Sequence, residues 1–136
     1  MIPWVEKYRP RTLSDIISQS KTVEHLKNMV KKKRFQHMIF TGAAGTGKTS
    51  TARSFINDVF VTHYPDSRSI NEWVFERNAS DDFRMSKGDV DSLKHFVTQS
   101  GISATNGHKF VLLEESDRMS VEVQSSLRRI MELASE

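Results

Sequence analysis

The stretch FTGAAGTGKTST, residues 40–51, decides the fold class of this chain. Residues 42–49 within it have the pattern G-x-x-x-x-G-K-T, which is typical of a loop whose bare backbone wraps a phosphate group. Glycines let successive backbone N–H groups point at the anion, and a helix that follows presents its positive end to the same charge. A flexible loop with a chance lysine is the alternative, and the flanking apolar patterns favour the phosphate-binding loop.

This loop predicts a nucleotide site with a magnesium ion. Lys48 is expected to reach the β- and γ-phosphate oxygens of ATP, and Thr49 is expected to hold Mg²⁺. The residues predicted to bind the nucleotide here are Gly42, Ala43, Ala44, Gly45, Thr46, Gly47, Lys48, Thr49 and Ser50.

Apolar spacing along the chain predicts helices that alternate with strands. The predicted helices cover residues 20–33, residues 47–60, and the stretches that Asp89 and Ser120 would cap. The predicted strands are His37–Phe40, which we expect to be buried, Trp73–Asn78 and Lys109–Glu114. This alternation predicts an α/β fold with a parallel sheet and helices on both faces, in which ligands bind at the carboxyl ends of the strands.

An apolar strand that ends in Glu114 and Glu115 is the candidate for the acidic half of the site. In the usual layout an Asp supports the metal and the following Glu acts as base on the attacking water. Glu114 stands in the Asp position, so its carboxylate lies about one methylene further out, which is unfavourable for the strict octahedral geometry of Mg²⁺. Exposed acids without a role are the alternative.

Composition excludes several other classes of protein. The chain has 136 residues, enough for one domain at most, with a net charge of +3 and no cysteine. Disulfides, thiolate zinc sites and cysteine nucleophiles are therefore excluded. No apolar run approaches the roughly 20 residues that cross a bilayer, and the first ten residues do not have the layout of a secretion signal. The run Lys31–Arg34 suits either a solvated helix end or a contact to phosphates, and the solvated helix end is the favoured interpretation.

Four stretches together resemble one family, the small subunits of sliding-clamp loaders of the replication factor C type. They are Pro3–Pro10, Gly42–Thr49, Asn78–Asp82 and Glu114–Asp117. The phosphate-binding loop alone would be unspecific, whereas the first and third stretches are specific to this family. The resemblance covers nearly the whole chain.

The resemblance implies an AAA+ ATPase fold of the P-loop NTPase class. Residues 1–136 correspond to the N-terminal portion of such a domain, without the sensor strands, lid and collar that follow in the family. The fold would then be incomplete at its C-terminus, so we expect a fragment or a shortened relative. The arginine that completes a neighbour's site in this family lies beyond the matched portion.

The resemblance also implies roles for single residues. Val5, Tyr8, Arg9 and Pro10 correspond to the segment that cradles adenine. Simple packing is the alternative for Tyr8 and the nearby Trp4, and for Trp4 it is the favoured interpretation. Asn78 resembles a polar residue that holds the catalytic glutamate until DNA is sensed. A simple turn over Asn-Ala-Ser-Asp is compatible with that role.

The implied partners are the other subunits of a hetero-oligomeric ring, the sliding clamp and primer–template DNA, without a membrane. Arg84, Lys87 and Arg118 are candidates for sequence-independent phosphate contacts, against a simpler interpretation as solvated charges. The implied location is the nucleus in a eukaryote, a viral replication site in a host, or otherwise the cytoplasm or nucleoid.

Three functions remain open on the sequence. The first is an ATPase that loads a clamp onto DNA during replication and repair, with Glu115 and Lys48 as catalytic residues and Thr49 and Glu114 as metal ligands. The second is a subunit that binds ATP as structural glue without hydrolysing it, which the Glu at position 114 favours. The third is a nucleotide kinase or another enzyme with a phosphate-binding loop, which would need an acceptor pocket.

Overall fold

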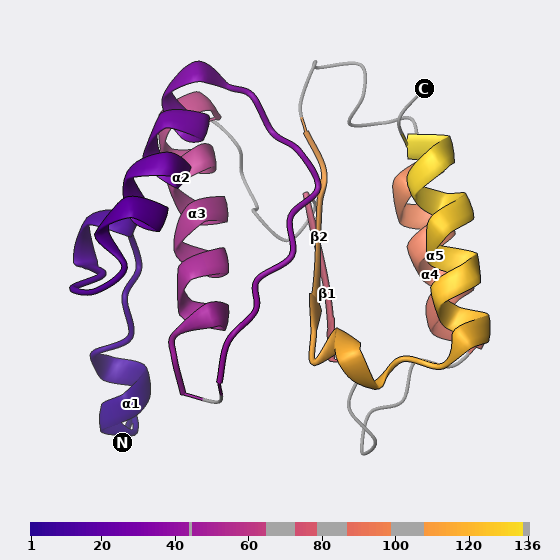
Figure 1. Cartoon of the computed structure of the whole chain (residues 1–136), viewed down its shortest axis with the longest axis horizontal. Helices are drawn as coiled ribbons and strands as arrows, with labels where there is room; N and C mark the ends of the chain where they lie inside the picture. Colours follow the sequence, from indigo (N-terminus) through magenta and orange to yellow (C-terminus); the bar gives the residue numbers. More distant parts are fainter. Residues whose placement is uncertain (44, 65–72, 79–86, 99–107, 135–136) are drawn as a thin grey trace. The chain divides into compact units, whose positions relative to one another are not determined.

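The computed structural model describes residues 1–43, 45–64, 73–78, 87–98 and 108–134 (Figure 1). The chain divides into two compact units, Met1–Arg68 and Ser69–Glu136, and each is described by itself. Residues 65–72, the part of the Asn-Ala-Ser-Asp box beyond Asn78 and residues 99–107 lie outside the described residues.

The first unit is helical in its described part. Its elements are α1 (Trp4–Lys7), the short 3₁₀ helix η1 (Leu13–Asp15), α2 (Ser20–Lys32) and α3 (Lys48–His63). The two long helices lie side by side with their C-terminal ends together (Figure 1). Both were predicted from apolar spacing, and the structure confirms them. The core side chains of this unit are Leu13, Val23, Leu26, Met29, Val30, Phe55, Ile56, Val59 and Phe60.

The strand predicted over His37–Phe40 is wrong in this structure. The segment has no assigned secondary structure, and the side chain of Ile39 is 87% exposed. A strand needs a neighbour that supplies ladder hydrogen bonds. Among the described residues of this unit no other strand is present to pair with the segment. The apolar run was a correct observation, but it does not by itself create a paired strand.

The second unit contains a parallel two-stranded sheet, β1 (Val74–Asn78) and β2 (Phe110–Glu114). The register pairs Val74 with Phe110 at one end and Asn78 with Glu114 at the other. Both strands and their parallel direction were predicted. The remaining elements of this unit are α4 (Lys87–Thr98), η5 (Ser116–Arg118) and α5 (Val121–Ala134).

Both helices of the second unit pack against the same side of β1. Phe75 forms a cluster with Leu93 of α4 and Ile130 of α5, and Val123 packs against Leu113 of β2. Paired residues of a parallel ladder share a face, so Asn78 and Glu114 lie on the opposite face from Phe75. The prediction of helices on both faces of the sheet stays a prediction.

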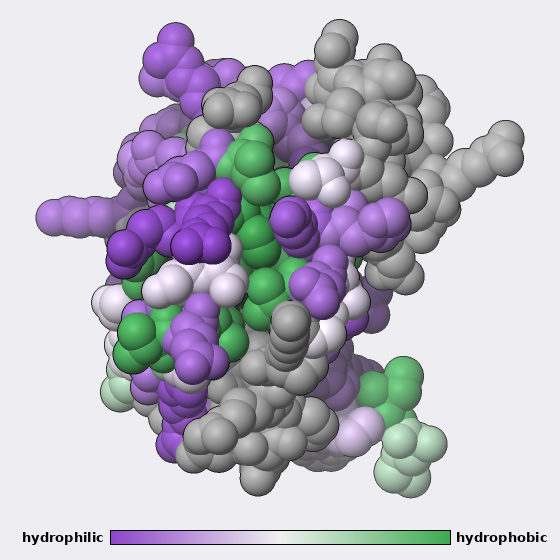
Figure 2. Space-filling model, turned by 90° about the vertical axis from the view of Figure 1, so that its right-hand side faces the viewer, coloured by the Kyte–Doolittle hydropathy of each residue, from purple (hydrophilic) through white to green (hydrophobic). Residues whose placement is uncertain are grey.

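The face of the second unit formed by α4 and α5 carries apolar groups at its surface. Figure 2 shows hydrophobic residues gathered in a strip there, bordered by hydrophilic ones. Along α5, three apolar side chains are exposed, namely Val121, Met131 and Leu133.

The predicted caps of the two helices have different outcomes. Ser120 caps α5 as expected, since its hydroxyl oxygen accepts a hydrogen bond from the N–H of Val123 at 3.3 Å. Asp89 is not a cap, because α4 begins at Lys87. Its carboxylate lies in the first turn, where negative charge suits the helix dipole, and pairs with Arg77 of β1 at 3.6 Å. The cap prediction at Asp89 is therefore wrong by three residues, since a cap there would start the helix at residue 90 and not at Lys87.

Candidate functional site

The loop before α3 has the backbone conformation that its glycines predict. Gly42, Gly45 and Gly47 have φ angles of 152°, 76° and 85°, in the region that side chains rarely adopt. At Gly42 space matters as well, because an added Cβ would lie 3.0 Å from the hydroxyl oxygen of Thr46. Glycine at these positions is thus a requirement of the turn and not only a source of flexibility.

Side chains of the loop close it from within. The ammonium group of Lys48 donates to the carbonyl oxygens of Gly42 and Ala43, and the hydroxyl of Thr46 donates to Ala43 at 2.8 Å. The structure therefore brings Lys48 together with the loop residues that the sequence assigned to the same site. Lys48 can reach an anion in the loop once its ammonium group leaves these carbonyls.

The N-terminus of α3 opens directly from this loop. Gly47 is the capping residue, and it has no side chain that could accept a hydrogen bond from the first turn. The hydroxyl of Thr51 donates to the carbonyl of Gly47 at 2.7 Å. The first backbone N–H groups of an α-helix have no acceptor within the helix itself. Thr49 and Ser50, both predicted site residues, lie half-buried in this first turn. Such an uncapped turn of a long helix favours a bound anion.

Three polar residues of α3, which the sequence analysis missed, fasten the N-terminal segment to this helix. The hydroxyl of Ser54 donates to the carbonyl of Pro10 at 3.2 Å, and the Asn57 amide donates to Arg11 at 3.0 Å. The carboxylate of Asp58 accepts from the N–H of Leu13 at 3.1 Å. Ser54 is completely buried. A serine among the apolar positions of the helix was the available signal, since buried hydroxyls need partners.

The segment expected to cradle adenine is exposed at its aromatic residues. Tyr8 is 70% exposed, and Trp4 meets it edge-on with ring centroids 6.4 Å apart. Trp4 itself is 79% exposed, so its packing against Tyr8 is a contact at the surface. Arg9 pairs with Glu6 at 3.0 Å. The side chain of Val5 and residue Ala44, both predicted to bind the nucleotide, lie outside the described part.

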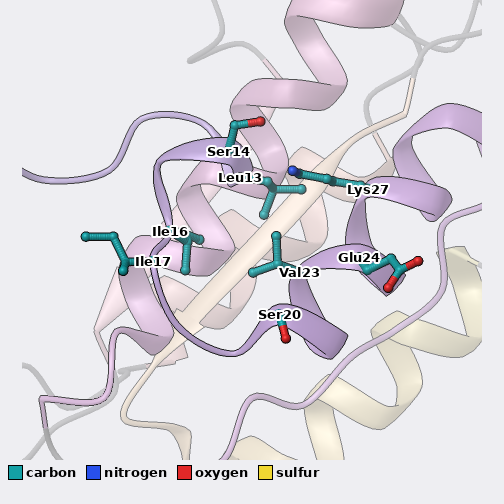
Figure 3. A pocket seen from close by; sticks show the side chains of 8 residues that line it. All are labelled: Leu13, Ser14, Ile16, Ile17, Ser20, Val23, Glu24 and Lys27. Carbon is teal, nitrogen blue, oxygen red and sulfur yellow. The ribbon is translucent and has the colours of Figure 1, made fainter.

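A groove of about 260 Å³ lies between η1 and the start of α2 (Figure 3). In Figure 3 Leu13 and Val23 point toward one another at its centre, and Ile17 points away. Glu24 and Lys27 also line it. No sequence motif indicated this groove.

The carboxylate of Asp15, in η1, accepts hydrogen bonds from the N–H groups of Arg11 and Thr12, both at 3.1 Å. These bonds hold the pKa of Asp15 below its usual range.

The acidic residues that the sequence analysis singled out belong to the second unit. The parallel register sets Asn78 beside Glu114 at the carboxyl ends of β1 and β2, on one face of the sheet. Glu115 follows immediately with φ 52°, a left-handed conformation that non-glycine residues rarely adopt, and its side chain is exposed. The sequence analysis expected Asn78 to lie near the catalytic glutamate, Glu115. In the ladder the direct partner of Asn78 is Glu114, the residue before it.

The basic residues considered for DNA contact are only partly described. Arg118 lies exposed in η5, close to the start of α5. Arg84 and the side chain of Lys87 fall outside the described residues. Among the helices that the structure describes, none has both the length and the apolar character that a bilayer crossing requires.

Comparison with known proteins assigns the chain to a family. Residues 18–133 match the profile of the family described as DNA polymerase III, delta subunit. A replication factor C small subunit from Sulfurisphaera tokodaii is 39% identical over 138 residues, which cover 99% of this chain and 39% of that protein. One from Aeropyrum pernix is 40% identical over 97% of this chain and 38% of its own length.

A eukaryotic relative is similar to the same degree. Replication factor C subunit 4 of Saccharomyces cerevisiae is 38% identical over 136 residues, which cover 98% of this chain and 39% of that protein. The chain therefore spans about two fifths of the length of the curated relatives that it matches.

Proposed function

Since the chain belongs to the family described as DNA polymerase III, delta subunit, we propose that it is an ATP-binding and ATP-hydrolysing small subunit of a DNA clamp loader. In this role ATP would be used to load a sliding clamp onto primer–template DNA during replication and repair. Other loader subunits, the clamp and DNA are the proposed partners. The proposed location is the nucleus of a eukaryote or a viral replication site in a host, and otherwise the cytoplasm or nucleoid.

One observation carries the nucleotide part of this proposal. Three glycines with positive φ lead into an uncapped helix of 16 residues, with Lys48 folded over the loop. Backbone N–H groups, a helix dipole and an ammonium group then act on the same small volume, an arrangement that suits the phosphates of ATP. The likeness to an AAA+ domain, of which residues 1–136 would be the N-terminal portion, supports the same assignment.

Lys48 has the central role in binding. Its ammonium group would exchange the carbonyls of Gly42 and Ala43 for the β- and γ-phosphate oxygens. This exchange replaces neutral acceptors by charged ones, which strengthens the hydrogen bonds. Thr49 and Glu114 would supply oxygen ligands to Mg²⁺, which when bound neutralises charge on the phosphates.

Glu115 is proposed as the base that orients and deprotonates the attacking water. Its exposed carboxylate and its place just past the end of β2 suit that task. Asn78 lies beside Glu114 in the ladder, and Glu114 directly precedes this base in the chain. Asn78 is therefore proposed to restrain Glu115. Tyr8, with Val5, Arg9 and Pro10, is proposed to hold adenine, with the ring of Tyr8 accessible for stacking.

The alternative function is ATP binding without hydrolysis, as a structural element of the same assembly. The observation that favours it is Glu114 in the position where the metal-supporting residue is usually Asp. An ATPase assay of the full-length protein, with partner subunits, DNA and clamp present, separates the two functions. Turnover that Glu115→Gln abolishes supports the enzyme, whereas a parent protein that binds ATP without turnover supports the structural role.

A further inference from the structure

We propose that the C-terminal end of α2 is a docking surface for the phosphate backbone of single-stranded nucleic acid. The surface, here called the basic corner, consists of Lys31, Lys32, Lys33 and Arg34. All four side chains are exposed, and within the described part of the chain no ion pair joins any of them to an acidic residue. Four adjacent cations without acidic partners repel one another and attract a polyanion.

The basic corner is distinct from the nucleotide site. It lies where the C-terminal ends of α2 and α3 meet, whereas the phosphate-binding loop precedes the first residue of α3 (Figure 1). A helix of 16 residues separates the two by roughly 24 Å. The ring of His63 is hydrogen-bonded to the carbonyl oxygen of Val30, which fastens the two helix ends together. The corner therefore rests on a fixed support.

Lys33 shows that a helix dipole alone does not explain these cations. Lys33 is the residue that ends α2, and its backbone is left-handed, with φ 54° and ψ 39°. The N–H of Lys33 donates to the carbonyl oxygen of Val30, and the N–H of Arg34 to that of Met29, both at 3.2 Å. This is the turn in which glycine is strongly favoured, because a Cβ in the left-handed region is strained. A lysine here keeps that strain, which is explained if its charge has a use that glycine cannot supply.

The observations favour single-stranded nucleic acid as the occupant. The ammonium group of Lys33 lies 5.1 Å from the ring centroid of Tyr64, so the cations adjoin a partly exposed aromatic ring. Cations next to an aromatic ring are the usual means of binding single strands without sequence preference. A membrane surface is disfavoured, because a helix that lies on lipid needs an apolar face. The apolar residues of α2, Val23, Leu26, Met29 and Val30, are buried within the unit.

The first experiment measures binding of a fluorescein-labelled oligodeoxythymidylate to the full chain by fluorescence anisotropy at several salt concentrations. Nucleotide is left out, so that a failure of the proposed ATP site does not affect the result. For Lys31→Ala/Lys32→Ala we expect a loss of affinity of at least fivefold. The slope of the logarithm of the association constant against the logarithm of the salt concentration should fall in magnitude by about 1.4. Two lysines are removed, and each contact to a single strand contributes about 0.7 to the slope.

The matched control removes two exposed lysines elsewhere, in the variant Lys21→Ala/Lys94→Ala. This control should change affinity by less than twofold. Equal losses in both double variants would show a general charge effect and would overturn the proposal. Displacement of the oligonucleotide by polyglutamate at equal charge would indicate an acidic protein partner, and equal affinity for a duplex would exclude the single-strand assignment.

The second experiment uses Lys33→Gly, for which we expect stability and binding to change in opposite directions. Glycine relieves the strained turn, so the melting temperature should rise by a few degrees, whereas the affinity for the oligonucleotide should fall by about twofold to fivefold. If Lys33 had only a structural role, Lys33→Gly would raise the melting temperature and leave the affinity for the oligonucleotide unchanged. That result would also overturn the proposal.

Discussion

The glycine-rich loop and the acidic strand end are built on different physical principles. At Gly42–Lys48 the proposed function rests on the backbone, where glycines take positive φ angles. At Asn78 and Glu114 it rests on side chains, which the register of a parallel ladder sets side by side. The comparison teaches that the loop conformation depends on local sequence, whereas the arrangement of the acidic residues depends on a strand pair formed between distant segments.

The largest expected effect concerns the acidic half. In the assembled loader, Glu115→Gln should lower ATP turnover on the order of 10²–10⁴-fold, because a general base is lost. ATP binding should stay within about twofold, since the amide has the same size as the carboxylate. Turnover and nucleotide retention are measured on the same preparation. Unchanged turnover would remove Glu115 from the mechanism.

The next effect tests the loop. Lys48→Ala should weaken ATP binding roughly 10- to 100-fold, which corresponds to the loss of a charged hydrogen bond of about 1.5–3 kcal/mol. The melting temperature without nucleotide should hardly change, because the bonds of Lys48 to loop carbonyls are exposed. Isothermal titration with ATP and Mg²⁺ measures the loss. Equal retention by folded parent and variant would contradict the nucleotide site.

A smaller effect separates backbone from side-chain function within the loop. Gly47→Ala should lower the free energy of unfolding by about 1–2 kcal/mol, because the φ angle of 85° is strained for a residue with a Cβ. Nothing lies within 4 Å of the added Cβ, so the effect should come from the backbone conformation alone. Gly88→Ala in α4 is the matched control, and it should be neutral or stabilising, since alanine suits a helix better. Thermal unfolding of both variants measures the difference. Equal behaviour would mean that the left-handed turn at Gly47 is not required.

The smallest effect is a dependence of stability on pH in the unit that contains the loop. The pKa of Asp15 is held below its ordinary value of 3.8 by hydrogen bonds from the N–H groups of Arg11 and Thr12. The stability from this group is therefore present above pH 3.8 and is lost as the pH falls through the lowered pKa. The Asp15→Asn variant should have a slightly lower melting temperature than the parent protein at pH 6. Below pH 3 the difference between the two melting temperatures should become smaller. Melting curves at both pH values test this.

Sequence patterns predicted the helices well, because the relevant contacts are close in the chain. The apolar spacing from Val23 to Val30, and that from Phe55 to Phe60, indicated the buried faces of α2 and α3 correctly. The run at His37–Phe40 misled the same reasoning, because a strand needs a partner and apolar residues do not specify one. Asp89 was misplaced because α4 begins three residues earlier than a cap at this position would allow, and the carboxylate pairs with Arg77 of β1 instead.

The amino-acid sequence by itself determined the glycine-rich loop, the helix after it, the two parallel strands and the carboxylates that follow the second strand. Only the tertiary structure decided that Ser54 holds Pro10, 44 residues away, that Asn78 pairs with Glu114, and that Trp4 is exposed. The physical reason is the range of the interactions. Backbone preferences act over a few neighbouring residues, whereas register and anchoring depend on which distant segments meet when the chain folds.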